Sequence, residues 1–491
     1  MNTPRPRFDL QAAAVAAMRA HGFEPDFAPP VQTQLAALAA HPPRATPGAG
    51  IRDLRGLPWS SIDNETSRDL DQLEVAELLP DKAIRVQVAI ADVDAFVPRH
   101  SAIDAHAANA TTTVYTGVRN FPMLPEALST HATSLLEAQD NLSVVIEFVV
   151  SADGVVQSSD VYRAVVRNAA QLTYDGVGAW LDESGPAPAK VAASSVLQSQ
   201  LRLQDACAQA LRGARYRHGA LNIETIETRP VVLHGEVVDV VRQDKNRATE
   251  LIEDFMIAAN EVVARMLQAR HVASIRRVVK SPERWDRIVT LAGGLGGRLP
   301  AAPDSRALNE FLIERRAADP VRFADLSLAV IKLMGPGEYV LERPGDPNQG
   351  HFGLAVEDYT HSTAPNRRFA DLVTQRLVKA SLAGQPSPYG DGELSAVAGH
   401  CTLKENESRK VEREMSKRIA AVAMSGRIGE VFDAVVTGVT PRGTFVRVFK
   451  PRVEGLLARG AQGVDVGDKL RVALVSTDVQ QGYIDFARTA G

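Results

Sequence analysis

The chain has 491 residues, of which 45% are hydrophobic, a formal net charge of −4 at pH 7 and an isoelectric point near 6.3. This composition indicates a globular protein of two or three domains and excludes a predominantly disordered chain. Because the overall charge is slightly negative, a polyanionic partner would have to be held by local basic patches.

The cysteine content and the hydropathy pattern restrict the compartment. Cys207 and Cys401 are too few for a disulfide framework or a thiolate zinc site, which favours a reducing environment. Asp9, Gln11 and Arg19 interrupt the alanine-rich start, which argues against an export signal. No stretch approaches the roughly 18 uninterrupted apolar residues of a membrane span. We therefore expect a cytoplasmic protein without membrane contact, and a monomer, because nothing indicates an oligomeric partner.

The first segment is predicted to be helical. Its apolar pattern predicts one helix over residues 9–21, ended by Gly22, and a second over 31–40. Residues 41–50, HPPRATPGAG, have the composition of a linker. Residues 1–50 therefore form a small helical unit, for which a helix-turn-helix and a packing extension without a binding role are equally good interpretations.

An unusual acidic stretch follows at residues 61–77, SIDNETSRDLDQLEVAE, with six acidic side chains. Asp69 and Asp71 are two residues apart, so their side chains leave the same face of an extended chain. Asp63 lies across a polar turn. Three carboxylates could therefore meet at one point and hold a hard divalent cation, while a solvated acidic loop is the alternative.

A calcium-binding loop is a second alternative for this stretch. Asp63 and Glu74 have the spacing of the first and twelfth ligands of such a loop. However, Arg68 occupies the position that requires glycine, and the flanking residues resemble strands, so we set this interpretation aside.

The next 350 residues mix strand and helix patterns. Alternation of apolar and polar residues predicts strands over 83–97 and 141–150, and helical periodicity predicts a long helix over 248–270. This mixture indicates one large α+β domain over residues 51–425.

Two arginines open a predicted helix within this domain. Thr363, Pro365 and the apolar residues that follow predict a helix that starts near position 365. Arg367 and Arg368 would then lie in its first turn, where they oppose the helix dipole unless an anion binds. A phosphate could be held there by free backbone N–H groups and a bidentate guanidinium. Two solvated arginines are the alternative.

Three further residues have ordinary roles when judged by pattern alone. Glu253 and Glu412 flank the apolar stripes of their helices, where a solvated glutamate is the common case. Tyr115 lies in a stretch rich in threonine and glycine, and core packing is its ordinary role.

The last segment, residues 426–491, contains five short strand patterns separated by glycine and proline turns. This pattern predicts a compact five-stranded barrel of the OB type. Phe445, Arg447 and Phe449 alternate onto one strand face, and aromatic with basic side chains suit single-stranded nucleic acid. One of the two phenylalanines is expected to pack in the core instead.

Several of these segments together resemble the ribonuclease II / ribonuclease R (RNB) exoribonuclease family. The acidic stretch is similar to the family's metal-binding signature, an isoleucine–aspartate start followed by Asp-x-Asp-Asp, with Gln72 in place of the fourth aspartate. Four further segments resemble family motifs in the family's order: 111–129, 251–260, 351–377 and 408–415. The resemblance spans roughly 51–425, and the terminal barrel resembles the family's S-one-type RNA-binding domain.

The resemblance implies a hydrolytic 3′→5′ exoribonuclease that degrades single-stranded RNA to nucleoside 5′-monophosphates. It assigns Asp63, Asp69, Asp71 and Gln72 to the binding of Mg²⁺, with Mn²⁺ as an alternative, and makes Asp71 critical for cleavage. Gln72 can offer an amide oxygen but no negative charge, so weaker metal binding than with aspartate is expected.

The same resemblance assigns the residues that contact RNA. Arg367 would steady the scissile phosphate, and Glu412 would be catalytic. Tyr115 would stack on a base near the 3′ end, and Glu253 would contact a ribose 2′-hydroxyl, the group that separates RNA from DNA. Arg368 is a weaker candidate for RNA contact.

The chain departs from the family pattern in two further places. Ala364 and Asn366 replace the usual serine and isoleucine, so this loop is expected to be shaped differently. Only about fifty residues, predicted helical, precede the catalytic segment, where well-known bacterial members carry two cold-shock-type barrels. Two other functions stay open: a non-catalytic RNA-binding or regulatory protein on the same scaffold, and a nuclease that acts on DNA.

Overall fold

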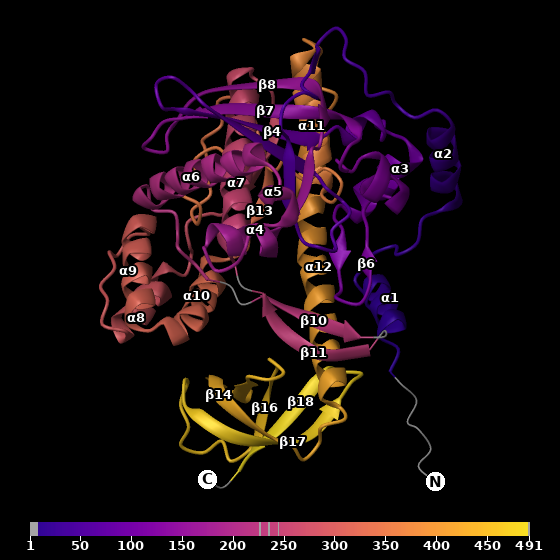
Figure 1. Cartoon of the computed structure of the whole chain (residues 1–491). Helices are drawn as coiled ribbons and strands as arrows, with labels where there is room; N and C mark the ends of the chain where they lie inside the picture. The colour runs from indigo at the N-terminus through magenta and orange to yellow at the C-terminus, as the bar shows by residue number, and fades with distance from the viewer. Residues whose placement is uncertain (1–7, 225–226, 234–235, 244, 490–491) are drawn as a thin grey trace.

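The structure is a computed structural model with a large α+β body, helices on its flank and a C-terminal barrel (Figure 1). It describes residues 8–224, 227–233, 236–243 and 245–489. The predicted α+β architecture with a closed five-stranded barrel is confirmed.

A seven-stranded sheet forms the centre of the body, in the order β1-β8-β7-β4-β3-β2-β9. Its strands are β1 (Ile51–Asp53), β2 (Ser60–Asp63), β3 (Gln72–Leu78), β4 (Ile84–Ala91), β7 (Asp140–Val150), β8 (Val156–Arg167) and β9 (Ala170–Thr173). The pairs β1–β8 and β2–β9 are parallel and the other pairs are antiparallel. The central strands are rich in valine and isoleucine, which suits strands covered on both faces.

Helices cover the sheet and complete the main core. Those of the body are α3 (Ala102–Ala110), α4 (Tyr174–Leu181), α5 (Ala189–Ala192), α6 (Ser195–Arg217), α7 (Arg247–Ala269) and α11 (Phe369–Leu382). Helices α4, α6 and α7 pack against β2, β3 and β7 (Figure 1). Phe255 of α7 meets Phe148 of β7 edge to face, with ring centroids 6.2 Å apart.

Helix α12 (Asp391–Met424) runs from the body to the barrel (Figure 1). The N-terminal helix α1 (Leu10–Ala20) packs on it, and Met18 shares a small core with Val411 and Met415. The second helix, α2 (Pro29–Ala40), packs against α3. The two N-terminal helices are thus confirmed, whereas a helix-turn-helix role stays a prediction.

Three helices inserted in the sequence of the body form a small subdomain with its own core. It consists of α8 (Trp285–Gly294), α9 (Ser305–Ala318) and α10 (Pro320–Met334), packed around Trp285 and Phe323. Shorter elements complete the fold: β5 (Val114–Tyr115), β6 (Asn120–Phe121), β10 (Glu227–Leu233), β11 (Glu236–Gln243), β12 (Ser274–Val278), β13 (Glu338–Glu342) and two single-turn helices, Val93–Ala95 and Leu128–Ala132.

The barrel closes in the order β14-β15-β16-β18-β17. Its strands are β14 (Val431–Thr440), β15 (Gly443–Val448), β16 (Glu454–Arg459), β17 (Lys469–Asp478) and β18 (Tyr483–Arg488). The end of α12 packs into its core through Ile419 and Met424. On the outside of the barrel, Arg447 forms an ion pair with Asp325 of α10 at 3.2 Å, which connects the barrel to the helical subdomain.

Two details differ from the sequence predictions. The strand expected over 83–97 ends at Ala91, because Asp92 accepts a hydrogen bond from the N–H of Ala95 and starts a helical turn. Neither Phe445 nor Phe449 enters the barrel core: Phe445 is half-buried and Phe449 is 48% exposed. None of the helices among the described residues has the length and apolar character needed to cross a membrane.

Candidate functional site

The turn that carries Arg367 lies before helix α11, not inside it. Helix α11 begins at Phe369, so the predicted start near position 365 is wrong. The reason is pairing with a distant segment: the N–H of Thr113 donates to the carbonyl of Arg367 at 3.0 Å, and the N–H of Phe369 donates to that of Thr111 at 2.8 Å. These bonds keep the chain extended at the end of the turn, so the dipole argument does not apply to Arg367 as expected.

The turn delivers Arg367 to the carboxylate of Asp71. Arg367 Nε lies 3.4 Å from Asp71 Oδ2, and the N–H of Asn366 donates to Asp71 Oδ1 at 3.1 Å. The Asp71 side chain is 2% exposed, whereas that of Arg367 is 46% exposed. Asp71 is therefore fixed in the floor of the site, and Arg367 extends from it toward solvent.

Burial dominates the ionisation of Asp71. Burial and, to a smaller extent, nearby Asp69 raise the pKa of Asp71, the charge of Arg367 and the N–H of Asn366 lower it, and the net result is a pKa of about 7. In the absence of a cation, this carboxyl is therefore close to half protonated at neutral pH. A cation bound beside it would favour the charged form.

The other predicted aspartates lie near the same point. Asp63, at the end of β2, accepts a hydrogen bond from the N–H of Asn64 at 2.7 Å, and burial raises its pKa. Desolvation also raises the pKa of the Tyr115 hydroxyl; Arg367 lowers it, and the charges of Asp69, Asp71 and Asp63 raise it. The phenol of Tyr115 therefore faces the acidic cluster.

Strand β5 connects Tyr115 to the predicted catalytic glutamate. The N–H of Tyr115 donates to Glu412 Oε1 at 3.4 Å, and Ser408 Oγ donates to the same oxygen at 3.3 Å. Burial raises the pKa of Glu412, and these two donors oppose the shift. The Tyr115 side chain is 42% exposed, which leaves its ring accessible. Glu412 is thus not the freely solvated residue that its helical position alone suggests.

A cavity of about 1050 Å³ opens between this region and the barrel. Tyr115 and Glu412 line it on one side, and the barrel residues Arg442, Phe445 and Arg447 line it on the other. Four of the predicted functional residues, Tyr115, Glu412, Phe445 and Arg447, therefore line this cavity. Arg447 contributes less charge than expected, because it pairs with Asp325 and Glu454.

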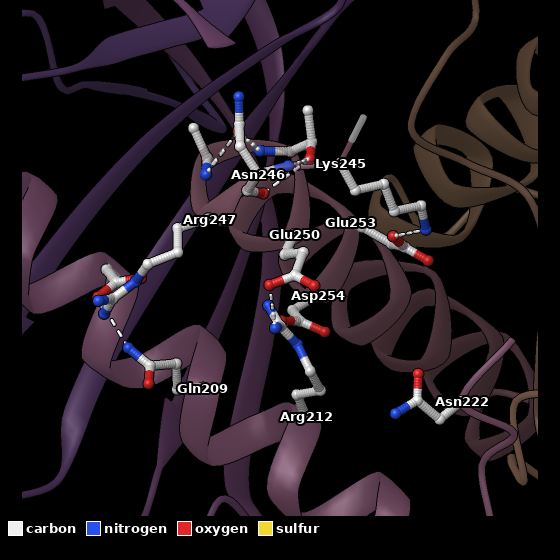
Figure 2. A network of polar contacts seen from close by, with 12 residues as sticks. Gln209, Arg212, Asn222, Lys245, Asn246, Arg247, Glu250, Glu253 and Asp254 are labelled. Atoms are coloured by element: carbon white, nitrogen blue, oxygen red, sulfur yellow. Dashed lines mark hydrogen bonds and ion pairs between the residues drawn. The ribbon is translucent and has the colours of Figure 1, made fainter. Parts of the chain in front are cut away.

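Two predicted RNA-contacting residues have other partners in the structure. Arg368 holds Asp371 with two hydrogen bonds of 2.8 and 2.7 Å. Glu253 pairs with Lys245 at 2.6 Å and lines a second cavity of about 230 Å³, beside the contact of Arg212 with Asp254 (Figure 2). Their roles toward RNA stay predictions.

The substitution at position 366 is accommodated by a hydrogen-bond pair. Thr133 Oγ1 donates to Asn366 Oδ1 at 2.5 Å, and Asn366 Nδ2 donates to the Thr133 carbonyl at 3.3 Å. The amide is buried and satisfied, so it locks the turn that presents its backbone N–H to Asp71.

The acidic cluster offers a donor set of the kind that hard divalent cations prefer. Among the residues that the structure describes, no group of three or more His, Cys, Asp or Glu side chains is arranged so that it could hold a metal ion. However, the side chains are carboxylates, as Mg²⁺ and Mn²⁺ require. Gln72, at the start of β3, is buried and contributes only an amide.

Sequence reasoning missed one buried carboxylate in this stretch, on strand β3. Glu74 is completely buried, and neither of its carboxyl oxygens has a hydrogen-bond partner. By strand alternation, Gln72 and Glu74 leave β3 on the same face, opposite that of Asp71. The fit of the implied metal therefore rests on the carboxylates of Asp63, Asp69 and Asp71, the oxygen donors that such a cation prefers.

Comparison with protein families gives two matches. A family model described as the RNB domain matches residues 51–384, and a model described as the RNase II-type exonuclease C-terminal S1 domain matches residues 430–489. The resemblance inferred from the motifs is thereby confirmed.

Curated relatives include two named ribonuclease R. The protein from Thermotoga maritima is 31% identical over 469 residues, which cover 89% of this chain and 64% of that protein. The protein from Escherichia coli is 28% identical over 509 residues, 96% of this chain and 61% of that protein. The chain thus spans somewhat less than two thirds of the length of these relatives.

Solved structures share the fold at low identity. Mycoplasma genitalium RNase R in complex with ribose-methylated single-stranded RNA superposes with a TM-score of 0.86 at 23% identity, over 98% of this chain and 78% of that one. Yeast Ssd1, described as a pseudonuclease, superposes with a TM-score of 0.65 at 16% identity, over 82% and 50% of the two chains.

Proposed function

This chain belongs to the RNB-domain family, whose model matches more than half of it, and from that premise we propose that it is a Mg²⁺-dependent 3′→5′ exoribonuclease. It would hydrolyse single-stranded RNA and release nucleoside 5′-monophosphates. The observation that carries the proposal is the contact between Arg367 and buried Asp71, made beside the exposed ring of Tyr115.

Asp63, Asp69 and Asp71 would hold the cation, with Mn²⁺ as a substitute. Bound there, the metal would neutralise phosphate charge and activate a water molecule. The protein's own contribution is to desolvate the carboxylates and to fix Asp71 through the N–H of Asn366. Such a site needs ligands that are held in place, because a shift of a ligand by about 0.5 Å already degrades the coordination geometry.

When RNA binds, Arg367 would leave the carboxylate of Asp71 and pair with a phosphate of the RNA. Its guanidinium is half exposed and lies at 3.4 Å from Asp71, a loose ion pair. A phosphate group can accept two parallel hydrogen bonds from a guanidinium, whereas Asp71 would turn to the cation. The scissile phosphate would thus be held between the cation and Arg367.

The end of the RNA chain would be seated by Tyr115, beside the catalytic Glu412. The ring of Tyr115 offers a stacking surface for the last bases, and its backbone N–H orients Glu412. The RNA strand would then extend through the cavity toward Phe445 and Arg442 of the barrel.

Incubation of single-stranded RNA, labelled at its 5′ end, with the protein and Mg²⁺ tests the proposal. Stepwise shortening with release of 5′-monophosphates supports it. The Asp71→Asn variant is the matched control, because it keeps the shape of the side chain and should retain RNA binding without turnover.

A non-catalytic RNA-binding role is the second candidate. It is favoured by the neutral Gln72 in the acidic cluster and by the likeness of the fold to a pseudonuclease. Intact RNA, retarded on a native gel, would support this role over the exonuclease. Equal cleavage of DNA strands would instead indicate a nuclease without sugar selectivity, and a strand with a single ribose near its 3′ end separates that case.

A further inference from the structure

Asp371 is a buried acid that the roles assigned above leave unexplained. It lies in the first turn of α11 and is 0% exposed. Its Oδ1 accepts the N–H of Ala364 at 2.9 Å and Nη2 of Arg368 at 2.7 Å, and its Oδ2 accepts Nε of Arg368 at 2.8 Å. Burial of a carboxylate is costly unless the charge is paired and hydrogen-bonded, and these three bonds supply both.

The direction of these bonds differs from that of an ordinary acid at the start of a helix. Such an acid usually faces the free N–H groups and the positive end of its own helix. The bond from Asp371 to Ala364 instead reaches seven positions back along the chain, and Arg368 lies directly before the helix. The carboxylate therefore connects the two sides of the turn formed by residues 364–368.

Arg367 projects from this turn between the two points that Asp371 holds. The N–H groups of Arg367 and Arg368 donate to the carbonyl of Ala364 at 3.2 and 3.0 Å, so the backbone closes on itself there. Residues 362–366 are buried, whereas Arg367 is exposed. The direction of the Arg367 side chain therefore depends on how firmly both sides of the turn are held.

Both contacts from the turn to Asp71 lie within the same five residues. They are the bond from the N–H of Asn366 at 3.1 Å and the approach of Arg367 Nε at 3.4 Å. A shift of the chain at residue 364 or 368 would move both donors relative to Asp71.

We propose that Asp371 is a positioning residue, which clamps both sides of the turn and thereby directs Arg367 at the scissile phosphate. This inference rests on the proposed function, because the phosphate is the one that the exoribonuclease would cleave. Arg368 is then the second half of the clamp and not a contact to RNA.

Single-turnover cleavage of labelled RNA, with the protein in excess, tests the proposal. The Asp371→Asn variant keeps the shape of the side chain and removes the charge that holds Arg368. Its cleavage rate constant is expected to fall by about 100-fold, the cost of a catalytic group misplaced by about 1 Å. The dissociation constant for RNA should stay within about threefold, since the other RNA contacts remain. A cleavage rate equal to that of the unaltered chain would overturn the inference.

A double-mutant cycle with Arg367 separates positioning from a general disturbance of the site. In Arg367→Ala there is no guanidinium left to direct, so the addition of Asp371→Asn should lower the residual rate constant by no more than about twofold. If Asp371→Asn costs the same factor in both backgrounds, its effect does not pass through Arg367 and the proposal is wrong.

Asp104 offers a matched control for damage to α11. It is also a buried acid, it accepts the N–H of His100 at 2.7 Å, and it pairs with Arg376 of α11 at 2.8 Å. Asp104→Asn therefore makes the same change at the same kind of contact. It should lower the melting temperature but not the cleavage rate constant; equal loss of rate in both variants would contradict a specific role of Asp371.

A milder variant tests the other half of the clamp and serves if Asp371→Asn does not fold. Arg368→Lys keeps the charge beside Asp371 but gives up the planar fork, so the rate constant should fall by about tenfold with RNA affinity unchanged. Weaker RNA binding at an unchanged rate constant would place Arg368 on the RNA and overturn the clamp.

The outcomes distinguish this inference from the proposed function. If the unaltered chain degrades RNA and both Asp371→Asn and Arg368→Lys cleave at its rate, only the clamp fails. If the unaltered chain releases no nucleotide, the exoribonuclease fails and the inference fails with it.

Discussion

At the scale of single residues, the two ends of the Arg367–Asp71 contact have opposite environments. Asp71 is enclosed, and Arg367 is half exposed. Each property leads to a prediction of its own, one for stability and one for turnover.

The raised pKa of Asp71 predicts a pH-dependent stability of the metal-free protein. The folded pKa of about 7 lies above the ordinary value of 3.8, so the folded state holds the proton more tightly than the unfolded state. The stability that Asp71 contributes is therefore complete below about pH 4 and is lost as the pH rises through 7. Relative to Asp71→Asn, the unaltered chain should lose up to about 4 kcal/mol over this range.

Chemical denaturation in the presence of a chelator, at pH 4 to 7.5, measures this difference. Saturating Mg²⁺ should reduce it, because the cation favours the charged carboxylate. Parallel pH profiles for the two chains would show that Asp71 titrates normally.

We expect that replacement of Arg367 lowers the turnover rate and leaves the stability of the fold unchanged. The Arg367→Lys variant keeps the charge but not the planar fork that holds a phosphate with two bonds. We expect kcat to fall by about 100-fold, the usual cost of one donor to a developing charge. The melting temperature should stay within about 2 °C, since the side chain is half exposed. An unchanged single-turnover rate for this variant would exclude Arg367 from the reaction.

Residues of the candidate site could be predicted from the sequence where their spacing along the chain is informative. Asp69 and Asp71 share a face of an extended chain by simple alternation, and the structure places both at the cluster. Glu74 was missed because the surrounding motif drew attention to its aspartates, and alternation places it on the face of β3 opposite Asp71. Burial without a partner is a property of the folded chain and cannot be seen in the sequence.

At the scale of elements, the two-residue strand β5 has a larger role than its length suggests. Its backbone reaches Glu412 of α12, while the ring of Tyr115 faces the acidic floor. Strand β5 therefore joins Tyr115, the residue proposed to stack on RNA bases, to helix α12, which carries Glu412.

The position of Tyr115 predicts an effect on where digestion stops. Loss of the ring in Tyr115→Ala removes about 1–3 kcal/mol of stacking per base, so short RNA should dissociate earlier and the final fragments should be longer. Tyr115→Phe keeps the ring and should leave the fragment length unchanged. Denaturing gels of complete digests measure this length, and identical end products for Tyr115→Ala would remove the residue from the binding path.

Element boundaries were predictable where local signals act alone. Helices α1 and α7 begin directly after Asp9 and Asn246, whose side chains cap the first N–H groups. The start of α11 was misplaced because the backbone around Arg367 pairs with residues 111–113, more than 250 positions away. No local pattern carries that information.

At the scale of the whole molecule, the cavity between the body and the barrel combines residues from distant parts of the chain. Arg442 and Arg447 both line it, but among the described parts of the chain only Arg447 has ion-pair partners, Asp325 and Glu454. Exposed Arg442 is therefore the better candidate for a direct phosphate contact.

This difference predicts a change in the salt dependence of RNA binding. For a single strand, each neutralised phosphate contributes about −0.7 to the slope of log K against log salt, so Arg442→Gln should make the slope shallower by about that amount. Arg459→Gln, at an exposed barrel residue outside the cavity lining, is the control and should leave the slope unchanged. Equal slopes for all three chains would place the RNA elsewhere.

Helix α12 sets a fixed length between the barrel and the acidic floor. Its last residue, Met424, is buried in the barrel core, and Glu412 lies twelve residues earlier, which is about 18 Å along a helix axis. An unbroken helix does not stretch, so it acts as a ruler. An oligonucleotide too short to span this distance would contact either the barrel or the region around Glu412, but not both.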